Sequence, residues 1–172
     1  MQSKETWNEK NNGSGFGGGA SKGCVAPSVV SPKKADLPAF PQSEYASIKV
    51  DGSETLSGQA FLTTMGGDVK VAAGQDIMLM PKTSYTDAIY NYQTTGVAYN
   101  TPDSRYAKYT KMVQADAQGK FTFTDIAPGK YYVETMIMWY RPSQFGLMPE
   151  GGLVITPTEV VKGKNNTVMV TR

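Results

Sequence analysis

From about Glu44 onward, the chain consists of short apolar runs that alternate with polar residues and end at Gly, Asp, Asn or Pro. Alternation with a period of two residues is typical of β-strands whose two faces meet different surroundings. The content of 18 Gly and 10 Pro also suits short strands joined by turns better than it suits helices. We therefore predict an all-β fold of antiparallel strands. The runs expected in strands are 48–50, 59–62, 69–71, 76–80, 113–115, 120–124, 130–139, 153–155, 160–161 and 166–170.

A hairpin turn is the clearest local feature of this pattern. Asp116 starts the turn and Gly119 ends it, at a place where a positive φ is expected. An Asp at the start of a β-turn normally accepts hydrogen bonds from the turn backbone, so we assign Asp116 to the turn rather than to a calcium site. A second turn follows at Pro128 and Gly129. The side chains expected to pack in the core around these turns are Phe121, Phe123, Tyr131 and Val133.

The run from Lys130 to about Trp139 is the longest expected strand, and its residues alternate between two faces. One face carries Tyr131, Val133, Thr135, Ile137 and Trp139, and the other carries Tyr132, Glu134, Met136, Met138 and Tyr140. Both faces are largely apolar, so one of them must line the core. We expect the other to be covered by the long segment 81–112 or to be exposed as an interaction surface. Glu134 is expected to be an ordinary strand residue that faces solvent.

Residues 1–43 differ in composition from the rest of the chain. A Gly-rich stretch over 11–19 is followed by four prolines, with few large apolar side chains between them. Because such a segment buries little apolar surface, we expect a flexible, disordered tail and linker over 1–43 and one folded domain over 44–172. We find no run of about 18 apolar residues that would predict a membrane span. The first 23 residues also lack the apolar core of a signal peptide.

Histidine does not occur among the 172 residues, which removes the commonest general base and the commonest neutral metal ligand. We therefore expect no catalytic site, no metal and no cofactor. The net charge of +2, from 17 basic and 15 acidic residues, predicts no basic face for nucleic acid. The single cysteine, Cys24, cannot form an internal disulfide, so the fold is expected to depend on its core and its sheet hydrogen bonds.

Four segments, in this order, resemble the carboxypeptidase regulatory-like domain: 58–61, 73–79, 115–123 and 126–133. Their shared pattern is Asp-x-x-Gly-x-Phe-x-Phe at 116–123, followed by Pro-Gly-x-Tyr-x-Val at 128–133. The resemblance implies a seven-stranded antiparallel sandwich of the transthyretin or prealbumin type. Such domains are appended to enzymes or displayed in the bacterial envelope, where they mediate attachment or assembly. The fold hosts many functions, so the resemblance says little about activity.

Residues 74–95 also resemble a bacterial subgroup whose members are mostly envelope lipoproteins of the periplasm or outer membrane. In such proteins a lipidated cysteine tethers the chain to the membrane, and Cys24 is the candidate anchor. Lys22 stands near Cys24 where a small residue is usual, so we expect this tether only if an apolar leader lies upstream of Met1. Two enzyme classes with related sandwiches, the hydroxyisourate hydrolases and the intradiol dioxygenases, depend on His and are excluded.

Six of the ten tyrosines lie between Pro81 and Met112, and tyrosine is enriched at protein interfaces. The same rings could instead pack over the outer face of the sandwich. The candidate partner-binding residues are Tyr85, Tyr90, Tyr92, Tyr99, Tyr106, Tyr109, Trp139, Tyr140 and Arg141.

Our leading hypothesis is a non-catalytic structural module that binds protein partners, including further copies of itself, for assembly or surface attachment in a bacterial envelope or a larger complex. The alternative is a sandwich that binds a small ligand or a carbohydrate through an aromatic patch around Trp139 and Tyr140.

Overall fold

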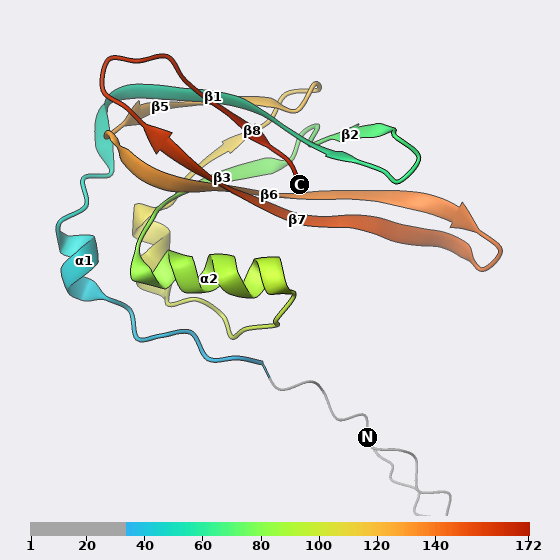
Figure 1. Cartoon of the computed structure of the whole chain (residues 1–172), viewed down its shortest axis with the longest axis horizontal. Helices are drawn as coiled ribbons and strands as arrows, with labels where there is room; N and C mark the ends of the chain where they lie inside the picture. Colours follow the sequence, from blue (N-terminus) through green and yellow to red (C-terminus); the bar gives the residue numbers. More distant parts are fainter. Residues whose placement is uncertain (1–33) are drawn as a thin grey trace, which may run out of the picture. The chain divides into compact units, whose positions relative to one another are not determined.

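The computed structural model describes residues 34–172 (Figure 1), and strands dominate them. Cys24 and most of the expected tail lie outside the described residues. The elements, in chain order, are α1 (Gln42–Ala46), β1 (Asp51–Thr63), β2 (Val69–Val71), β3 (Asp76–Pro81), α2 (Ser84–Thr95), the 3-10 helix η1 (Ser104–Tyr109), β4 (Lys111–Gln114), β5 (Lys120–Ile126), β6 (Gly129–Ser143), β7 (Gly146–Val160) and β8 (Asn166–Val170). None of the helices within 34–172 is long and apolar enough to cross a membrane.

The strands form two four-stranded sheets. In the first sheet, β1 pairs with β2, β5 and β8, and the second sheet has the order β4-β3-β6-β7. The described residues thus contain eight strands, which corrects the expected seven. The pairing of β8 with β1 is parallel, so the sheets are rich in antiparallel pairs but not wholly antiparallel. Strand β8 lies beside the long strand β1, which is far away from it in the sequence. Local turn signals therefore could not predict this pairing.

One hydrophobic core draws buried side chains from both sheets. The four core residues predicted from the sequence are confirmed, because Phe121, Phe123, Tyr131 and Val133 are between 0% and 6% exposed. The predicted turn is confirmed as well. Asp116 Oδ1 accepts hydrogen bonds from the backbone N–H groups of Gln118 and Lys120, both at 2.8 Å. Gly119 has a φ of 74°, and a Cβ there would lie 2.6 Å from the carbonyl oxygen of Ala60.

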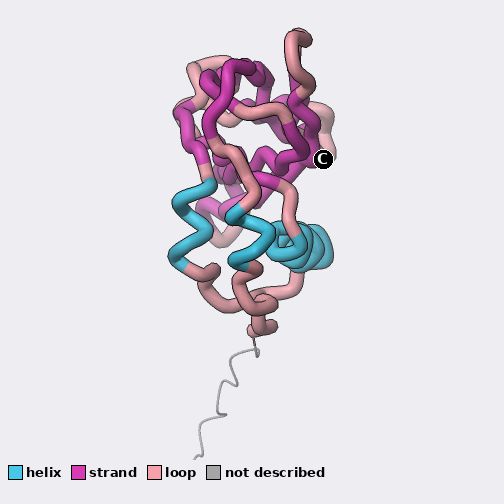
Figure 2. Tube along the Cα trace, turned by 90° about the vertical axis from the view of Figure 1, so that its left-hand side faces the viewer, coloured by secondary structure: helices cyan, strands magenta, loops and turns pink. Residues whose placement is uncertain are grey.

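A helical layer covers part of the second sheet, and the strand pattern did not predict it. Figure 2 shows the helices gathered on one side of the strands. Around α2 lies a second apolar cluster built on Tyr45, Tyr85 and Ile89. Leu37 and Phe40 pack against this cluster, and Ala35 pairs with Tyr99 in an isolated bridge. Packing therefore begins before Glu44, inside the segment expected to be a linker, because the apolar side chains of that segment find partners on α2.

The start of α2 carries a capping box. The side chain of Thr83 accepts a hydrogen bond from the backbone N–H of Thr86 at 3.1 Å, and the side chain of Thr86 accepts one from the N–H of Thr83 at 2.8 Å. These bonds satisfy backbone donors that the helix itself leaves free. Gly96 ends the helix in the left-handed conformation, with a φ of 71°. The helix is therefore defined by its two ends.

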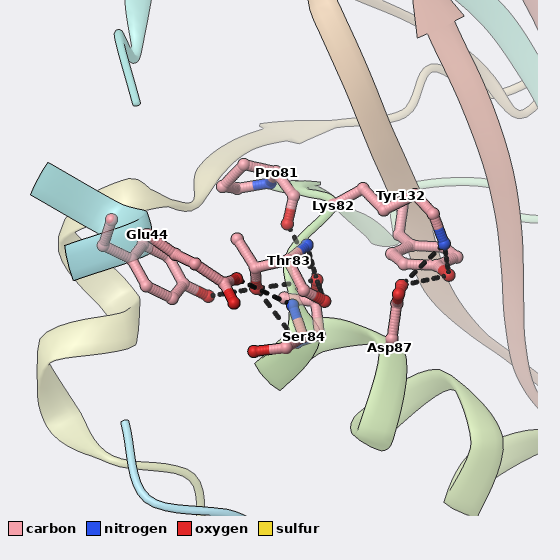
Figure 3. A network of polar contacts seen from close by, with 9 residues as sticks. Glu44, Pro81, Lys82, Thr83, Ser84, Asp87 and Tyr132 are labelled. Atoms are coloured by element: carbon pink, nitrogen blue, oxygen red, sulfur yellow. Dashed lines mark hydrogen bonds and ion pairs between the residues drawn. The ribbon is translucent and has the colours of Figure 1, made fainter. Parts of the chain in front are cut away.

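Polar contacts attach this helix start to its neighbours (Figure 3). Glu44, from α1, accepts a hydrogen bond from the backbone N–H of Ser84 at 2.8 Å. Asp87 accepts one from the hydroxyl of Tyr132, on β6, at 2.7 Å, and forms an ion pair with Lys82 at 2.6 Å. The first turn of α2 thus holds α1 on one side and the second sheet on the other.

Strands β6 and β7 form a long hairpin with fifteen paired positions, joined by a turn at Gln144 and Phe145. The α2 layer covers only the first part of the outer face of β6, where Tyr132 stacks on Tyr90. Beyond that part the hairpin projects past α2 (Figure 1). There the side chains of Met136, Met138 and Tyr140 are 45%, 50% and 68% exposed. Both outcomes expected for this face therefore occur, each on a different half of the strand.

Candidate functional site

The candidate site begins at Trp139, where β6 leaves the core. The residues that precede Trp139 on its face of β6, down to Tyr131, are buried, and the half-buried indole packs against their cluster. Trp139 is thus the first ring on this face with an open side. The alternation of β6 sets this position, because every second side chain returns to the same face.

A carboxylate holds the indole in place. Glu150, on β7, is the direct cross-strand partner of Trp139, and its Oε2 accepts a hydrogen bond from the indole Nε1 at 3.0 Å. Its Oε1 forms an ion pair with the guanidinium of Arg141, two residues along β6 on the same face. The hydrogen bond from Arg141, and then that from Trp139, lowers the pKa of Glu150. The three side chains form one connected polar and aromatic unit.

One glycine in β7 makes room for this unit. Gly151 has a φ of 106°, and a Cβ there would lie 2.0 Å from the carbonyl oxygen of Ile137 and 2.9 Å from the indole carbon Cζ3 of Trp139. Only glycine fits this position without a shift of the backbone or the ring. Beside it, the guanidinium of Arg172 approaches the carbonyl oxygen of Gly151 at 3.4 Å.

The opposite wall comes from the hairpin between β1 and β2. Its turn is tightened by a hydrogen bond from the backbone N–H of Asp68 to the hydroxyl of Thr64, at 3.0 Å. Lys70 lies 4.0 Å from the carboxylate of Asp68. Between the two walls is an open groove of about 880 Å³. We call it the Trp139 groove; it is lined by Thr63, Thr64, Met65, Gly66, Asp68, Lys70, Trp139, Tyr140, Arg141, Pro142, Glu150, Gly151 and Arg172.

The groove combines the indole ring of Trp139 with carboxylates that accept hydrogen bonds, cations that donate them and hydroxyls that do both. A flat ring offers contact to the C–H face of a ligand, while carboxylates accept and cations donate hydrogen bonds around it. A few polar groups around an apolar surface are the usual arrangement in a small-molecule site. The groove therefore suits a ligand that has both C–H faces and many hydroxyls.

Three of the predicted site residues, Trp139, Tyr140 and Arg141, line this groove. Tyr140 lies at its rim, but its ring projects from the opposite face of β6, because neighbouring residues of a strand alternate. Nothing in the described residues tests the role predicted for Cys24, which lies outside them.

The six tyrosines of segment 81–112 have a different place. Tyr85 is only 2% exposed, which corrects the prediction that it lies on a partner-binding surface. Tyr99, Tyr106 and Tyr109 are half-buried and pack against the same second cluster. Of the remaining two rings, Tyr90 stacks on Tyr132 of β6 at 4.9 Å and Tyr92 stacks on Tyr99 at 5.9 Å between ring centroids. These rings are used mainly to attach α2 and η1 to the second sheet.

Sequence reasoning missed four of the five charged residues that line the groove: Asp68, Lys70, Glu150 and Arg172. Glu150 had a local signal, since the run that contains it can pair back onto the strand of Trp139 across a two-residue turn. The other three come from segments far away in the sequence, and only the pairing of the sheets brings them to Trp139.

Comparison with solved structures shows a similarity that covers most of the chain. A protein of Pseudomonas aeruginosa whose crystal structure is described as that of a "putative carbohydrate binding protein" is similar to this chain at 30% sequence identity, with a TM-score of 0.73. The alignment covers 80% of this chain and 100% of that protein. No protein-family model matches the chain. No curated protein matches it either.

Proposed function

Since the chain belongs to the same family as this Pseudomonas aeruginosa protein, we propose that it binds carbohydrate in the Trp139 groove. The observation that carries the proposal is the indole of Trp139, fixed by Glu150 at the wall of an open groove. A pyranose ring stacks its C–H face on such an indole, and its hydroxyls hydrogen-bond to the groove carboxylates and cations.

We propose binding rather than hydrolysis. A glycosidase needs a carboxylic acid that stays protonated to donate to the leaving oxygen, and this requires a raised pKa. Glu150 is the groove carboxyl in contact with Trp139, and Arg141 lowers its pKa instead. Its hydrogen bonds are also used to orient the ring and the guanidinium. This supports a role in positioning, with bound sugar released unchanged.

The test is binding of soluble oligosaccharides, first on a glycan array and then by calorimetry with the best ligand. Trp139→Ala should weaken binding at least about tenfold, because the stacking surface is lost. Trp139→Phe should retain part of it, since an aromatic face remains, although the single ring is smaller than the indole and cannot donate to Glu150. Thermal melting monitored by circular dichroism checks that each variant is folded.

The matched control is Phe145→Ala. Phe145 is an exposed aromatic residue on the same hairpin, 84% accessible and outside the groove lining. This variant should bind sugar as the unmodified chain does. An array without any carbohydrate hit, or equal losses in Trp139→Ala and Phe145→Ala, would contradict the proposal.

We further propose that the two sheets are a sandwich of the carboxypeptidase regulatory-like type, displayed in a bacterial envelope. The buried motif residues Phe121 and Phe123, together with the turn at Gly119, support this assignment. The similarity to a bacterial protein supports a bacterial setting. The earlier hypothesis of protein assembly through the tyrosines of 81–112 gains no support, because four of those rings pack in the second cluster and the other two stack on Tyr132 and Tyr99.

A further inference from the structure

The outer end of the β6–β7 hairpin exposes large apolar side chains. Phe145 in the turn is 84% exposed, Leu147 is 67% exposed and Met148 is 45% exposed. These residues lie beyond the Trp139 groove, in the part of the hairpin that projects past the helices (Figure 1). Four cross-strand pairs separate the Trp139–Glu150 pair from the turn, a length of about 14 Å.

The charge pattern has a sharp boundary at this end. Arg141 and Glu150 form an ion pair across the hairpin, and residues 142–149 between them, which we call the hairpin tip, contain no charged residue. Leu147 and Met148 point to opposite sides of β7, so the tip carries apolar side chains on both faces and a charged side chain on neither. Its two cross-strand pairs extend about 7 Å beyond Arg141, and the turn adds to this.

Prolines reduce the number of backbone donors at the edges of the tip. Pro142, on β6, and Pro149, on β7, have no N–H group. Inside the hairpin, the backbone N–H and C=O groups of the two strands pair with each other along the ladder from Gly129–Val160 to Ser143–Gly146. Fewer backbone N–H groups at the strand edges then require a hydrogen bond to water. This lowers the free-energy cost of moving the tip into a medium poor in water.

We propose that the hairpin tip inserts into the interfacial layer of a lipid bilayer. The uncharged length matches the depth of about 5–10 Å at which apolar surface enters the headgroup and acyl boundary. Tyr140 and Arg141 stand at the start of the tip, at the level where aromatic rings and cations meet lipid headgroups. The boundary between charged and uncharged residues would then coincide with the membrane surface.

The shape of the tip favours lipid over a protein partner. A partner protein normally covers about 800 Å² on each side, and a two-stranded ribbon of two pairs offers much less on either face. A protein that docks on a sheet also uses one face, whereas the apolar side chains here occupy both faces and the turn. A bilayer surrounds the tip from all sides and suits this arrangement.

The experiment is flotation of the full chain with vesicles, one set of phosphatidylcholine alone and one of equal parts phosphatidylethanolamine and phosphatidylglycerol. The chain should float with at least one set. The double variant Phe145→Ser, Leu147→Ser should bind at least about tenfold more weakly, because two large apolar side chains no longer leave water. The control Met112→Ser, Met169→Ser removes two apolar residues elsewhere, which are 63% and 54% exposed, and should bind normally. Melting temperatures check that both variants fold.

A position-specific probe completes the test. In a Cys24→Ser background, an environment-sensitive dye on Phe145→Cys should shift its emission to the blue with vesicles, and the same dye on Met169→Cys should not. Failure of both vesicle sets to bind, or a tip dye that stays in water, would overturn the proposal. Loss of a dimer in the tip variant during ultracentrifugation, without vesicle binding, would assign the tip to a second copy instead. Trp139→Ala should keep vesicle binding, so this inference and the carbohydrate proposal fail separately.

Discussion

At Gly151 the missing side chain determines where the indole of Trp139 can lie. The backbone of β7 passes so close to Ile137 that a Cβ would overlap its carbonyl oxygen, and the φ of 106° belongs to a region that L side chains rarely adopt. The ring of Trp139 covers the space above this residue. A groove wall can therefore depend on a residue that has no side chain.

Gly151→Ala should destabilise the fold by roughly 2–4 kcal/mol, from backbone strain plus the clash with the Ile137 carbonyl. It should also move Trp139 and shift its fluorescence, measured in a Trp7→Phe background that leaves one tryptophan. The control is Gly146→Ala, with a similar φ of 104° but no neighbour within 4 Å of its Cβ. This variant should lose only the stability that corresponds to backbone strain, without the contribution of a clash. Equal urea midpoints for the two variants would refute the steric explanation.

Glu134 is the second residue that behaves differently from its expectation. It was predicted to face solvent, but its side chain is 6% exposed under the α2 layer and accepts a hydrogen bond from Gln93 Nε2 at 3.2 Å. Burial raises the pKa of this carboxyl. The amide oxygen of Gln93 is buried as well and has no hydrogen-bond partner among the described residues. The protonated form of Glu134 is thus favoured more in the folded chain than in the unfolded chain.

Glu134→Gln should remove an effect of pH on stability. A folded-state pKa above the unfolded one means that the folded chain binds more protons, so stability decreases as pH rises from the ordinary carboxyl pKa through the raised value. Gln cannot titrate, and its amide can also donate to Gln93. Relative to the unmodified chain, the variant should therefore gain stability across this window in urea titrations. A difference that stays constant with pH would contradict the assignment.

At the scale of elements, the strands were far more predictable than the helix. The bounds expected for β2 and β8 agree with the structure, because alternation and flanking turn residues act locally. Helix α2 was missed, since its run of Tyr, Thr and Asn has weak helix propensity. Its signals were the threonines of the capping box and the glycine after the last turn. Tyr85 and Ile89, four residues apart, also mark its buried face.

Thr83→Ala tests how much the cap contributes to the α2 layer. The change removes the hydrogen bond to the helix backbone and a bond to the hydroxyl of Tyr45, so we expect a loss of about 1–2 kcal/mol in urea denaturation. Ser84→Ala is the control, because Ser84 is the next residue and its exposed side chain should contribute within about 0.5 kcal/mol. A loss of the same size in both variants would show that the cap is not the cause.

At the scale of the whole molecule, long-range pairing decided what the sequence alone did not. The Trp139 groove takes residues from the β1–β2 hairpin, the β6–β7 hairpin and Arg172, and the parallel pairing of β8 with β1 sets where Arg172 lies. The sequence predicted Trp139 and Arg141, which are near neighbours in the chain, but it did not predict the other wall, whose residues lie far away in the sequence. The N-terminal boundary shows the same limit, because Leu37 and Phe40 gain their meaning only from the cluster around Tyr85.

A chain that starts at residue 44 should be less stable than one that starts at residue 34. The shorter chain lacks Phe40, which stacks on Tyr45 with ring centroids 4.4 Å apart, and Leu37 beside it. Partial burial of these two side chains corresponds to about 2–3 kcal/mol. Thermal melting of the two chains checks this. Identical midpoints would mean that residues 34–43 do not stabilise the folded part.

Strand β7 is the outer strand of the second sheet, fifteen residues long, and within residues 34–172 it pairs only with β6. A strand edge of this length would normally template the addition of further chains and the growth of fibrils. Pro149 and Pro157 interrupt the row of donors on this strand, and Gly151, with a φ of 106°, departs from extended strand geometry between them. Pro149, from the hairpin tip, and Gly151, from the groove wall, thus also make β7 a poorer template for an added strand.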